Sequence, residues 1–290
     1  MQQTLFNIVC VIALIYLVTV CRQATRHTLG VERLTVQDST AAQQGQKVNL
    51  FIGFYNDKDS NRQLENDFCL LKNIANPLID NIYVLLDNDK TILPGFLSDA
   101  ATLAPIQLPW SLTNQSMNET VSNKLHVKNV AKRPTFRDFF QVMNSVSQRN
   151  DVNIIANCDI FFDDTLQLVK DKLKPNQCYA LARWEIQSDD TLSLCTLPFS
   201  QDTWMLSGPI SPSKLNAMNI DFYQGLLACD MRIAYELKSV GYDVVNPSRT
   251  IKTYHMHKTQ VRNYSESTRV HGKTLEVPIT TLEEIESLYS

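Results

Sequence analysis

One acidic residue follows directly on a strongly apolar run of the chain. Asn157-Cys158-Asp159 comes after the strand-like run 152–156, and apolar residues flank Asp159 on both sides. In open α/β sheets, ligands bind beyond the carboxyl ends of the strands, and hard divalent cations prefer carboxylate oxygens. We therefore expect Asp159 to hold a divalent metal, Mn²⁺ or Mg²⁺. For Asp163 and Asp164, capping of the next helix is an equally good interpretation.

Two histidines near the C-terminus, His255 and His257, lie in the strand-like run 250–257. Side chains two residues apart in a strand point to the same side, and imidazole is a good ligand for Mn²⁺ or Zn²⁺. We expect both to bind the metal; the alternative is a pair of solvated strand histidines. Together with Asp159 they also have the composition of a zinc or non-haem iron site, and the spacing does not exclude one.

A further acidic residue, Asp230, opens an expected helix that ends before Gly241. An acidic residue at this position commonly caps its helix. Where the helix start faces a crevice, the same carboxylate can act as a general base that takes a proton from an acceptor hydroxyl. Capping and general base therefore remain the two interpretations of Asp230.

Two further stretches combine tryptophan with polar or charged neighbours. Trp204 follows Asp202, and Trp184 follows Arg183. An aromatic ring can stack on a sugar while polar neighbours hydrogen-bond its hydroxyls, so we list all four as sugar- or acceptor-binding candidates. Packing in the core is the alternative role for both tryptophans.

The elements that must position these residues alternate between strand and helix. The run 48–55 predicts a strand, and apolar residues at helical spacing predict a helix that Asn76-Pro77 ends. This order indicates an α/β fold with a mainly parallel sheet. Further strands are expected at 82–86, 152–156, 179–186, 242–245 and 250–257, and further helices at 164–173, at 230–240 and after a Thr135 cap.

The composition excludes some classes of protein. The net charge of −3 argues against a nucleic-acid-binding protein, which would carry a basic field. The seven cysteines include no C-x-x-C pair, which excludes zinc-finger and redox motifs of that type.

The first residues of the chain differ from the rest. The segment 5–21 is apolar and uncharged, with a length between that of a signal-peptide core and a membrane span. We expect a signal-anchor at 1–21, a stem at 22–46, one globular domain at 47–270 and a tail at 271–290. The protein would be a single-pass type II membrane protein of the Golgi or endoplasmic reticulum lumen if eukaryotic, or secreted if the segment is cleaved. Arg22 and Arg26 follow the segment and by themselves favour a cytoplasmic domain.

Several motifs in fixed order resemble a known family. They extend over most of the globular part and occupy 157–163, 180–184, 200–204, 229–237, 241–248 and 251–257. In this order and spacing the chain resembles glycosyltransferase-like proteins of the GT-A type, found in bacterial surface-polysaccharide loci and in some eukaryotes. The resemblance implies a mixed sheet flanked by helices, a divalent metal and a nucleotide-sugar donor.

The resemblance also implies roles for individual residues. Asn157-Cys158-Asp159 stands at the D-x-D position, with Asn157 in place of the first carboxylate and Asp159 as the metal ligand. His255 or His257 matches the late metal-binding histidine, and Asp230 matches the base of inverting relatives. The nucleotide-sugar donor would also contact Tyr55, Asp87 and Arg137.

We therefore expect a membrane-anchored or exported glycosyltransferase whose acceptor, a glycan, lipid or protein, is unknown. One alternative is a non-catalytic nucleotide- or carbohydrate-binding relative, which the missing first Asp favours. Another is a hydrolase or oxygenase that uses Asp159 and the two histidines as a closed metal cluster.

Overall fold

The computed structural model describes residues 45–86, 123–130, 132–259 and 265–289. The chain divides into units 1–45 and 46–290, and the fold below is that of the second unit. No helix among the described residues is long and apolar enough to cross a membrane. The expected signal-anchor, the stem up to residue 44 and Asp87 lie outside the described residues, and the expected domain boundaries stay predictions.

In chain order the elements are β1 (Val48–Phe54), α2 (Ser60–Ala75), β2 (Asn81–Leu86), β3 (Leu125–Asn129), α5 (Phe136–Val146), β4 (Val152–Ala156), β5 (Ile160–Phe162), α6 (Leu166–Lys172), β6 (Gln177–Leu181), β7 (Trp184–Ile186), β8 (Leu192–Leu194), β9 (Thr203–Ser207), α7 (Pro212–Ala217), α8 (Cys229–Ser239), β10 (Asp243–Val245), β11 (Thr253–His255), the 3₁₀ turn η1 (Glu266–Thr268) and α9 (Leu282–Ser287).

The main sheet has seven strands in the order β10-β6-β9-β4-β1-β2-β3. β9 runs antiparallel to both of its neighbours, and all other pairs are parallel. The mixed, mainly parallel sheet flanked by helices confirms the expected fold class. A second sheet has four short strands in the order β5-β11-β7-β8. Its strands β5 and β7 directly follow the main-sheet strands β4 and β6 along the chain, and it carries much of the candidate site.

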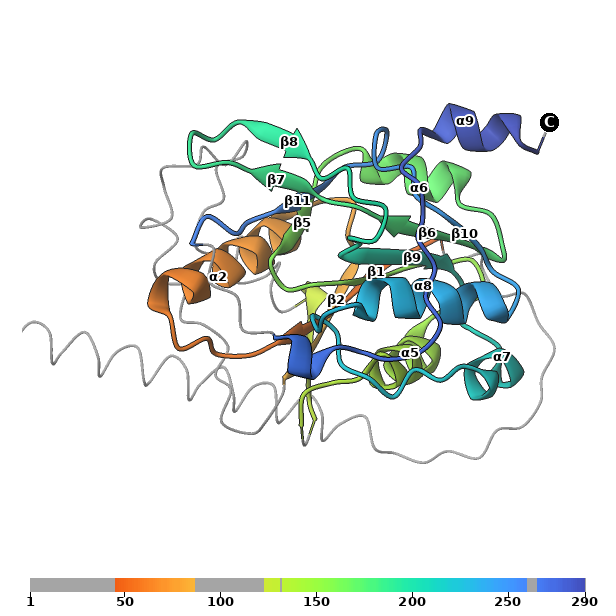
Figure 1. Cartoon of the computed structure of the whole chain (residues 1–290), viewed down its shortest axis with the longest axis horizontal. Helices are drawn as coiled ribbons and strands as arrows, with labels where there is room; N and C mark the ends of the chain where they lie inside the picture. The colour runs from red at the N-terminus through yellow and green to blue at the C-terminus, as the bar shows by residue number, and fades with distance from the viewer. Residues whose placement is uncertain (1–44, 87–122, 131, 260–264, 290) are drawn as a thin grey trace, which may run out of the picture. The chain divides into compact units, whose positions relative to one another are not determined.

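Helices cover both faces of the main sheet (Figure 1). Alternate residues of β1 enter two separate apolar clusters, because successive strand residues point to opposite faces. The cluster that contains Leu50 also includes residues of α2, α6 and α9, and the cluster that contains Phe51 includes residues of α5, α7 and α8. Burial on both faces explains why β1 and β4 read as continuous apolar runs in the sequence.

Local capping fixes where two of the helices begin. Asp59 caps α2 by accepting hydrogen bonds from the backbone N–H groups of Asn61 and Arg62. Thr135 caps α5 in a reciprocal capping box with Asp138, as the sequence predicts. α2 and α5 thus begin just beyond the carboxyl ends of β1 and β3. This is the edge of the sheet at which the candidate site lies.

One strand prediction and the sugar-binding interpretation of Trp204 need correction. The single strand expected at 179–186 is two strands, β6 and β7, which belong to different sheets and are separated at Ala182-Arg183. The stretch around Asp202 and Trp204, interpreted from sequence as a sugar-binding segment, leads into β9. β9 lies between β4 and β6, and Trp204 is buried in an apolar cluster with residues of α5 and α8.

Candidate functional site

The second sheet brings together residues that are far apart in the sequence. After β4 ends at Ala156, the turn Asn157-Cys158-Asp159 leads directly into β5. β11 pairs with β5 on one side, so that His255 lies opposite Ile160, and with β7 on the other, so that His255 lies beside Glu185. Strand pairing therefore places Asp159, His255 and Glu185 together.

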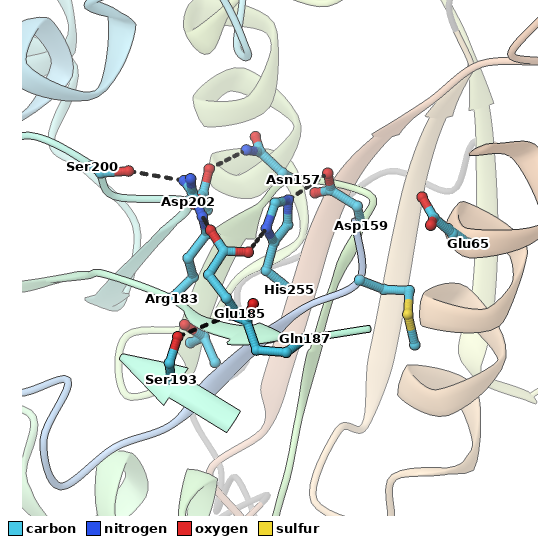
Figure 2. A network of polar contacts seen from close by, with 12 residues as sticks. Glu65, Asn157, Asp159, Arg183, Glu185, Gln187, Ser193, Ser200, Asp202 and His255 are labelled. Carbon is cyan, nitrogen blue, oxygen red and sulfur yellow. Dashed lines mark hydrogen bonds and ion pairs between the residues drawn. The ribbon is translucent and has the colours of Figure 1, made fainter. Parts of the chain in front are cut away.

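These side chains belong to a chain of alternating charges, which we call the polar network. It runs from α2 to the residue before β9 and comprises Glu65, Arg62, Asp159, His255, Glu185, Arg183, Asp202 and Asn157. Figure 2 shows its part from Asp159 through His255, Glu185 and Arg183 to Asp202 and Asn157. Each of its three cationic side chains lies between two carboxylates. The network therefore ties α2, the second sheet and the end of β4 into one site.

His255 is the centre of the polar network. Its Nε2 lies 3.0 Å from Oδ2 of Asp159, and its Nδ1 lies 2.6 Å from Oε2 of Glu185. Arg183 then joins Glu185 to Asp202, with contacts of 2.6 and 2.5 Å. Asn157 donates to Asp202 at 2.6 Å, so it turns away from Asp159.

The contacts shift the pKa values of these groups in opposite directions. Burial lowers the pKa of His255, but Asp159 and Glu185 outweigh it and raise that pKa to about 9. Burial raises the pKa of Asp159, yet His255 and Arg62 hold it well below its usual range. Glu185 is affected in the same way, with a pKa lowered to about 2. At neutral pH both carboxylates are ionised and His255 is protonated.

These shifts predict a pH-dependent stability. Because the pKa of His255 is about 9 in the folded chain against 6.5 for an unperturbed histidine, its protonation stabilises the fold. The contribution is present in full below pH 6.5, is lost as the pH rises towards 9, and is on the order of a few kcal/mol.

Urea unfolding of the metal-free chain between pH 6 and 9.5 would measure this contribution against a His255→Gln variant. We expect the difference in unfolding free energy between the two to shrink as the pH rises. A difference that is constant across this range would contradict the assignment.

Three side chains at the site, two from the polar network and His257 beside it, have the chemical types and the proximity needed to hold a cation. One ligand atom from each of Asp159, His255 and His257 lies within 4.8 Å of the others. Oδ1 of Asp159 is buried and has no hydrogen-bond partner in the described part of the chain. Glu185 can accept a hydrogen bond from Nδ1–H of His255, and a metal that displaces the proton of Nε2 would then bind that nitrogen, the usual arrangement of metal-binding histidines. These residues fit a divalent cation.

Asp230 lies in the first turn of α8 and is not its cap. The N-cap residue is Ala228, with a φ of 67° and no side-chain cap bond. Asp230 is half-buried, and burial, followed by the charge of Asp202, raises its pKa well above the usual range for a carboxyl. Asp230 and Asp159 are thus two carboxyl groups whose surroundings separate their pKa values, an arrangement typical of acid–base sites.

The other predicted residues differ in where they lie. Half-buried Tyr55 follows β1, and its pKa is raised by burial and by the nearby Cys158 and Asp159, which places it beside the metal-ligand candidates. Arg137 instead bonds to Asp221 and to the carbonyl groups of Leu215 and Met218, partners outside the polar network. The donor-binding role expected of Arg137 stays a prediction.

The two tryptophans differ in their surroundings. Trp204 is 0% exposed and packs edge-on against Phe136 in the core, so its ring cannot stack on a sugar. Trp184 lies between Arg183 and Glu185 in sequence, and its ring nitrogen donates to the Ser248 carbonyl. Alternation along the chain turns its side chain away from the face that carries those two residues. The core role applies to Trp204, and the expected sugar contact of Trp184 stays a prediction.

Three members of the polar network are absent from the sequence predictions, namely Arg62, Glu65 and Glu185. Arg62 and Glu65 lie in a helix that the sequence predicts from its apolar face alone. Glu185 carries a weak signal, since it is two residues after Arg183 and would share its face in a strand. Its pairing with His255 depends on two strands 70 residues apart.

Comparison with known proteins gives likeness in fold only. No protein-family model matches the chain, and no curated protein matches it. Among solved structures, the chain is similar to the mannosyltransferase PcManGT from Pyrobaculum calidifontis in complex with GDP-Man and Mn²⁺, with 12% identity and a TM-score of 0.43. That match covers 71% of this chain, which spans only 55% of the mannosyltransferase.

Two structures of 4-diphosphocytidyl-2C-methyl-D-erythritol synthase also match. One has 8% identity and a TM-score of 0.37, and the match covers 77% of this chain and 95% of the synthase chain. The other, from Anaerococcus prevotii, has 11% identity and a TM-score of 0.38, and the match covers 84% of this chain and 94% of the synthase chain. At these identities the similarity concerns the fold alone.

Proposed function

We propose that this protein is a glycosyltransferase that moves a sugar from a nucleotide-sugar donor to a hydroxyl acceptor with the help of a divalent metal. The observation that carries this proposal is the meeting of Asp159, His255 and His257 where β4 ends. The carboxyl edge of an open α/β sheet is where such folds bind their ligands. An acid of raised pKa, Asp230, is electrostatically linked to the same network through Asp202.

The chain's own residues would divide the work as follows. Asp159, His255 and His257 would hold the cation, which when bound supplies charge to neutralise the departing diphosphate. Two imidazoles in the ligand set favour Mn²⁺ over Mg²⁺, because Mg²⁺ prefers oxygen ligands. Asp230 would take the proton of the acceptor hydroxyl, which suits an inverting transfer.

The remaining candidates would position the donor. Tyr55 follows the end of β1 and is affected by the charge of Asp159, and we propose that it contacts the nucleotide, as would Asp87, which is outside the described residues. Asn157 cannot add a second carboxylate, and its amide is held by Asp202. Asp202 and Arg183 would therefore orient the loop and offer polar atoms to the sugar, and a single carboxylate of this loop would bind the metal.

A thermal-shift panel of nucleotide-sugars with and without Mn²⁺ tests the proposal. A ligand that binds only the native state stabilises it by about 2.7 kcal/mol at a concentration 100 times its dissociation constant. We expect at least one nucleotide-sugar to raise the melting temperature, and to raise it more with Mn²⁺. The free sugar and the nucleoside alone serve as matched controls. If Mn²⁺ stabilises the protein and no nucleotide-sugar does, the transferase proposal fails.

A second candidate is a different metal enzyme, a hydrolase or oxygenase. One observation favours it: two histidines and one carboxylate form a ligand set that also suits iron or zinc. It predicts tight binding of Fe²⁺ or Zn²⁺ without any nucleotide. The same panel, repeated with these two metals, separates the candidates.

A further inference from the structure

The carboxylate proposed as the metal ligand already has a permanent counter-ion, Arg62. Its Nη2 donates to Oδ2 of Asp159, the same oxygen that His255 contacts. Its Nη1 donates to Oε2 of Glu65 at 2.8 Å and to the Met256 carbonyl at 2.7 Å. Any metal that binds Asp159 must therefore bind beside a guanidinium.

Arg62 is firmly held in place. The residue is 5% exposed, and Glu65, its partner within α2, is fixed in turn by Thr259, whose N–H and Oγ1 donate to it at 2.8 and 2.9 Å. A guanidinium does not lose its charge in proteins. The positive charge next to Asp159 is thus built in, and it cannot be removed by deprotonation.

Arg62 lies in the first turn of α2, which contains no acidic residue. Cations are disfavoured at helix N-termini, where the helix dipole is positive, and anions are favoured there. The N-cap Asp59 already accepts hydrogen bonds from the N–H groups of Asn61 and Arg62 at this helix start, so the guanidinium of Arg62 is the group here that would repel a lone cation and attract a diphosphate.

We infer that Arg62 keeps the metal affinity of the free protein low, so that the metal binds well only together with a diphosphate. A divalent cation and a guanidinium beside the same carboxylate repel each other, and a diphosphate contacting both would offset this repulsion. By linkage, metal and nucleotide then strengthen each other's binding by the same factor. This inference rests on the proposed metal site. It adds to that site Arg62, which would contact the diphosphate and make strong metal binding depend on it.

Mn²⁺ titration followed by the electron paramagnetic resonance of free Mn²⁺ tests the inference on the full chain. We expect Arg62→Met to bind Mn²⁺ at least about tenfold more tightly than the wild type, or about 1.4 kcal/mol. Arg62→Lys keeps the charge and should bind as weakly as the wild type. Lys58→Met removes an exposed cation just before α2 and serves as a control for net charge.

A second titration with GDP or UDP present measures the coupling between metal and nucleotide. We expect the nucleotide to strengthen Mn²⁺ binding more in the wild type than in Arg62→Met. Arg62→Gln, which keeps a hydrogen-bond donor without the charge, repeats the test if the Met variant melts at a much lower temperature. Its metal affinity should rise in the same direction.

The outcomes separate this inference from the proposed function. If Arg62→Met and Arg62→Gln bind Mn²⁺ no more tightly than the wild type, or more weakly, Arg62 only orients Asp159 and the inference is wrong. Tighter binding by these variants with no effect of either nucleotide supports the low-affinity role of Arg62 and counts against both the coupling and the transferase proposal. Absence of Mn²⁺ binding to every variant overturns the metal site and the inference together.

Discussion

Asp230→Asn is expected to lower the turnover of sugar transfer by about 10²–10⁴-fold, the range typical for the loss of a general base. Asparagine has nearly the same shape but cannot take a proton from the acceptor hydroxyl. Donor binding should be unchanged, because Asp230 is not among the proposed metal or donor contacts. Steady-state kinetics at saturating donor, together with donor affinity, measure the two effects separately.

The pH dependence sharpens this test. The pKa of Asp230 is raised well above its ordinary value, first by burial and then by Asp202, so the carboxyl must lose its proton to act as a base. Turnover of the wild type should therefore rise with pH until that proton is lost, while the residual rate of Asp230→Asn should not show this rise. Asp171→Asn, which changes an exposed carboxylate on α6, is the matched control. A near-normal rate for Asp230→Asn would exclude the base role.

Asp159→Asn is expected to weaken Mn²⁺ binding more than about 100-fold, beyond the loss that follows when only a supporting residue of a metal site is changed. The substitution removes the single carboxylate of the proposed ligand set. It also leaves Arg62 and His255 without the buried charge that they share, and breaking a buried ion pair from one side costs about 3–5 kcal/mol. Calorimetry of metal binding and urea unfolding measure the two losses on the same sample.

A matched variant separates the local effect from a general one. Asp164→Asn changes an exposed carboxylate five residues along the same segment and should alter neither metal affinity nor stability appreciably. If Asp159→Asn loses stability and keeps its affinity for Mn²⁺, Asp159 is a structural partner of Arg62 and His255 and is not a metal ligand. The proposed metal site would then have to be abandoned.

The sequence by itself determined the features that depend on local pattern. Apolar runs followed by polar residues predict the strand ends, and they place Asp159 at the carboxyl end of β4. Alternation predicts that His255 and His257 face the same side, and the structure places both beside Asp159. The Thr135 cap and the mainly parallel sheet follow from equally local signals, namely capping chemistry and the order of strands and helices.

Only the tertiary structure decided which distant groups meet. Arg62 and Asp159 are 97 residues apart, and no periodicity within α2 indicates that its first turn lies against the end of β4. The role of Glu185 depends on the parallel pairing of β7 with β11, and strand pairing depends on contacts that are not local in sequence. Trp204 is buried because α5 and α8 cover the face of the sheet to which its side chain points, whereas its sequence neighbours alone suggested a sugar-binding surface. The strand end Asn157-Cys158-Asp159 is thus visible in the sequence, but its charge balance is set by residues that folding brings to it.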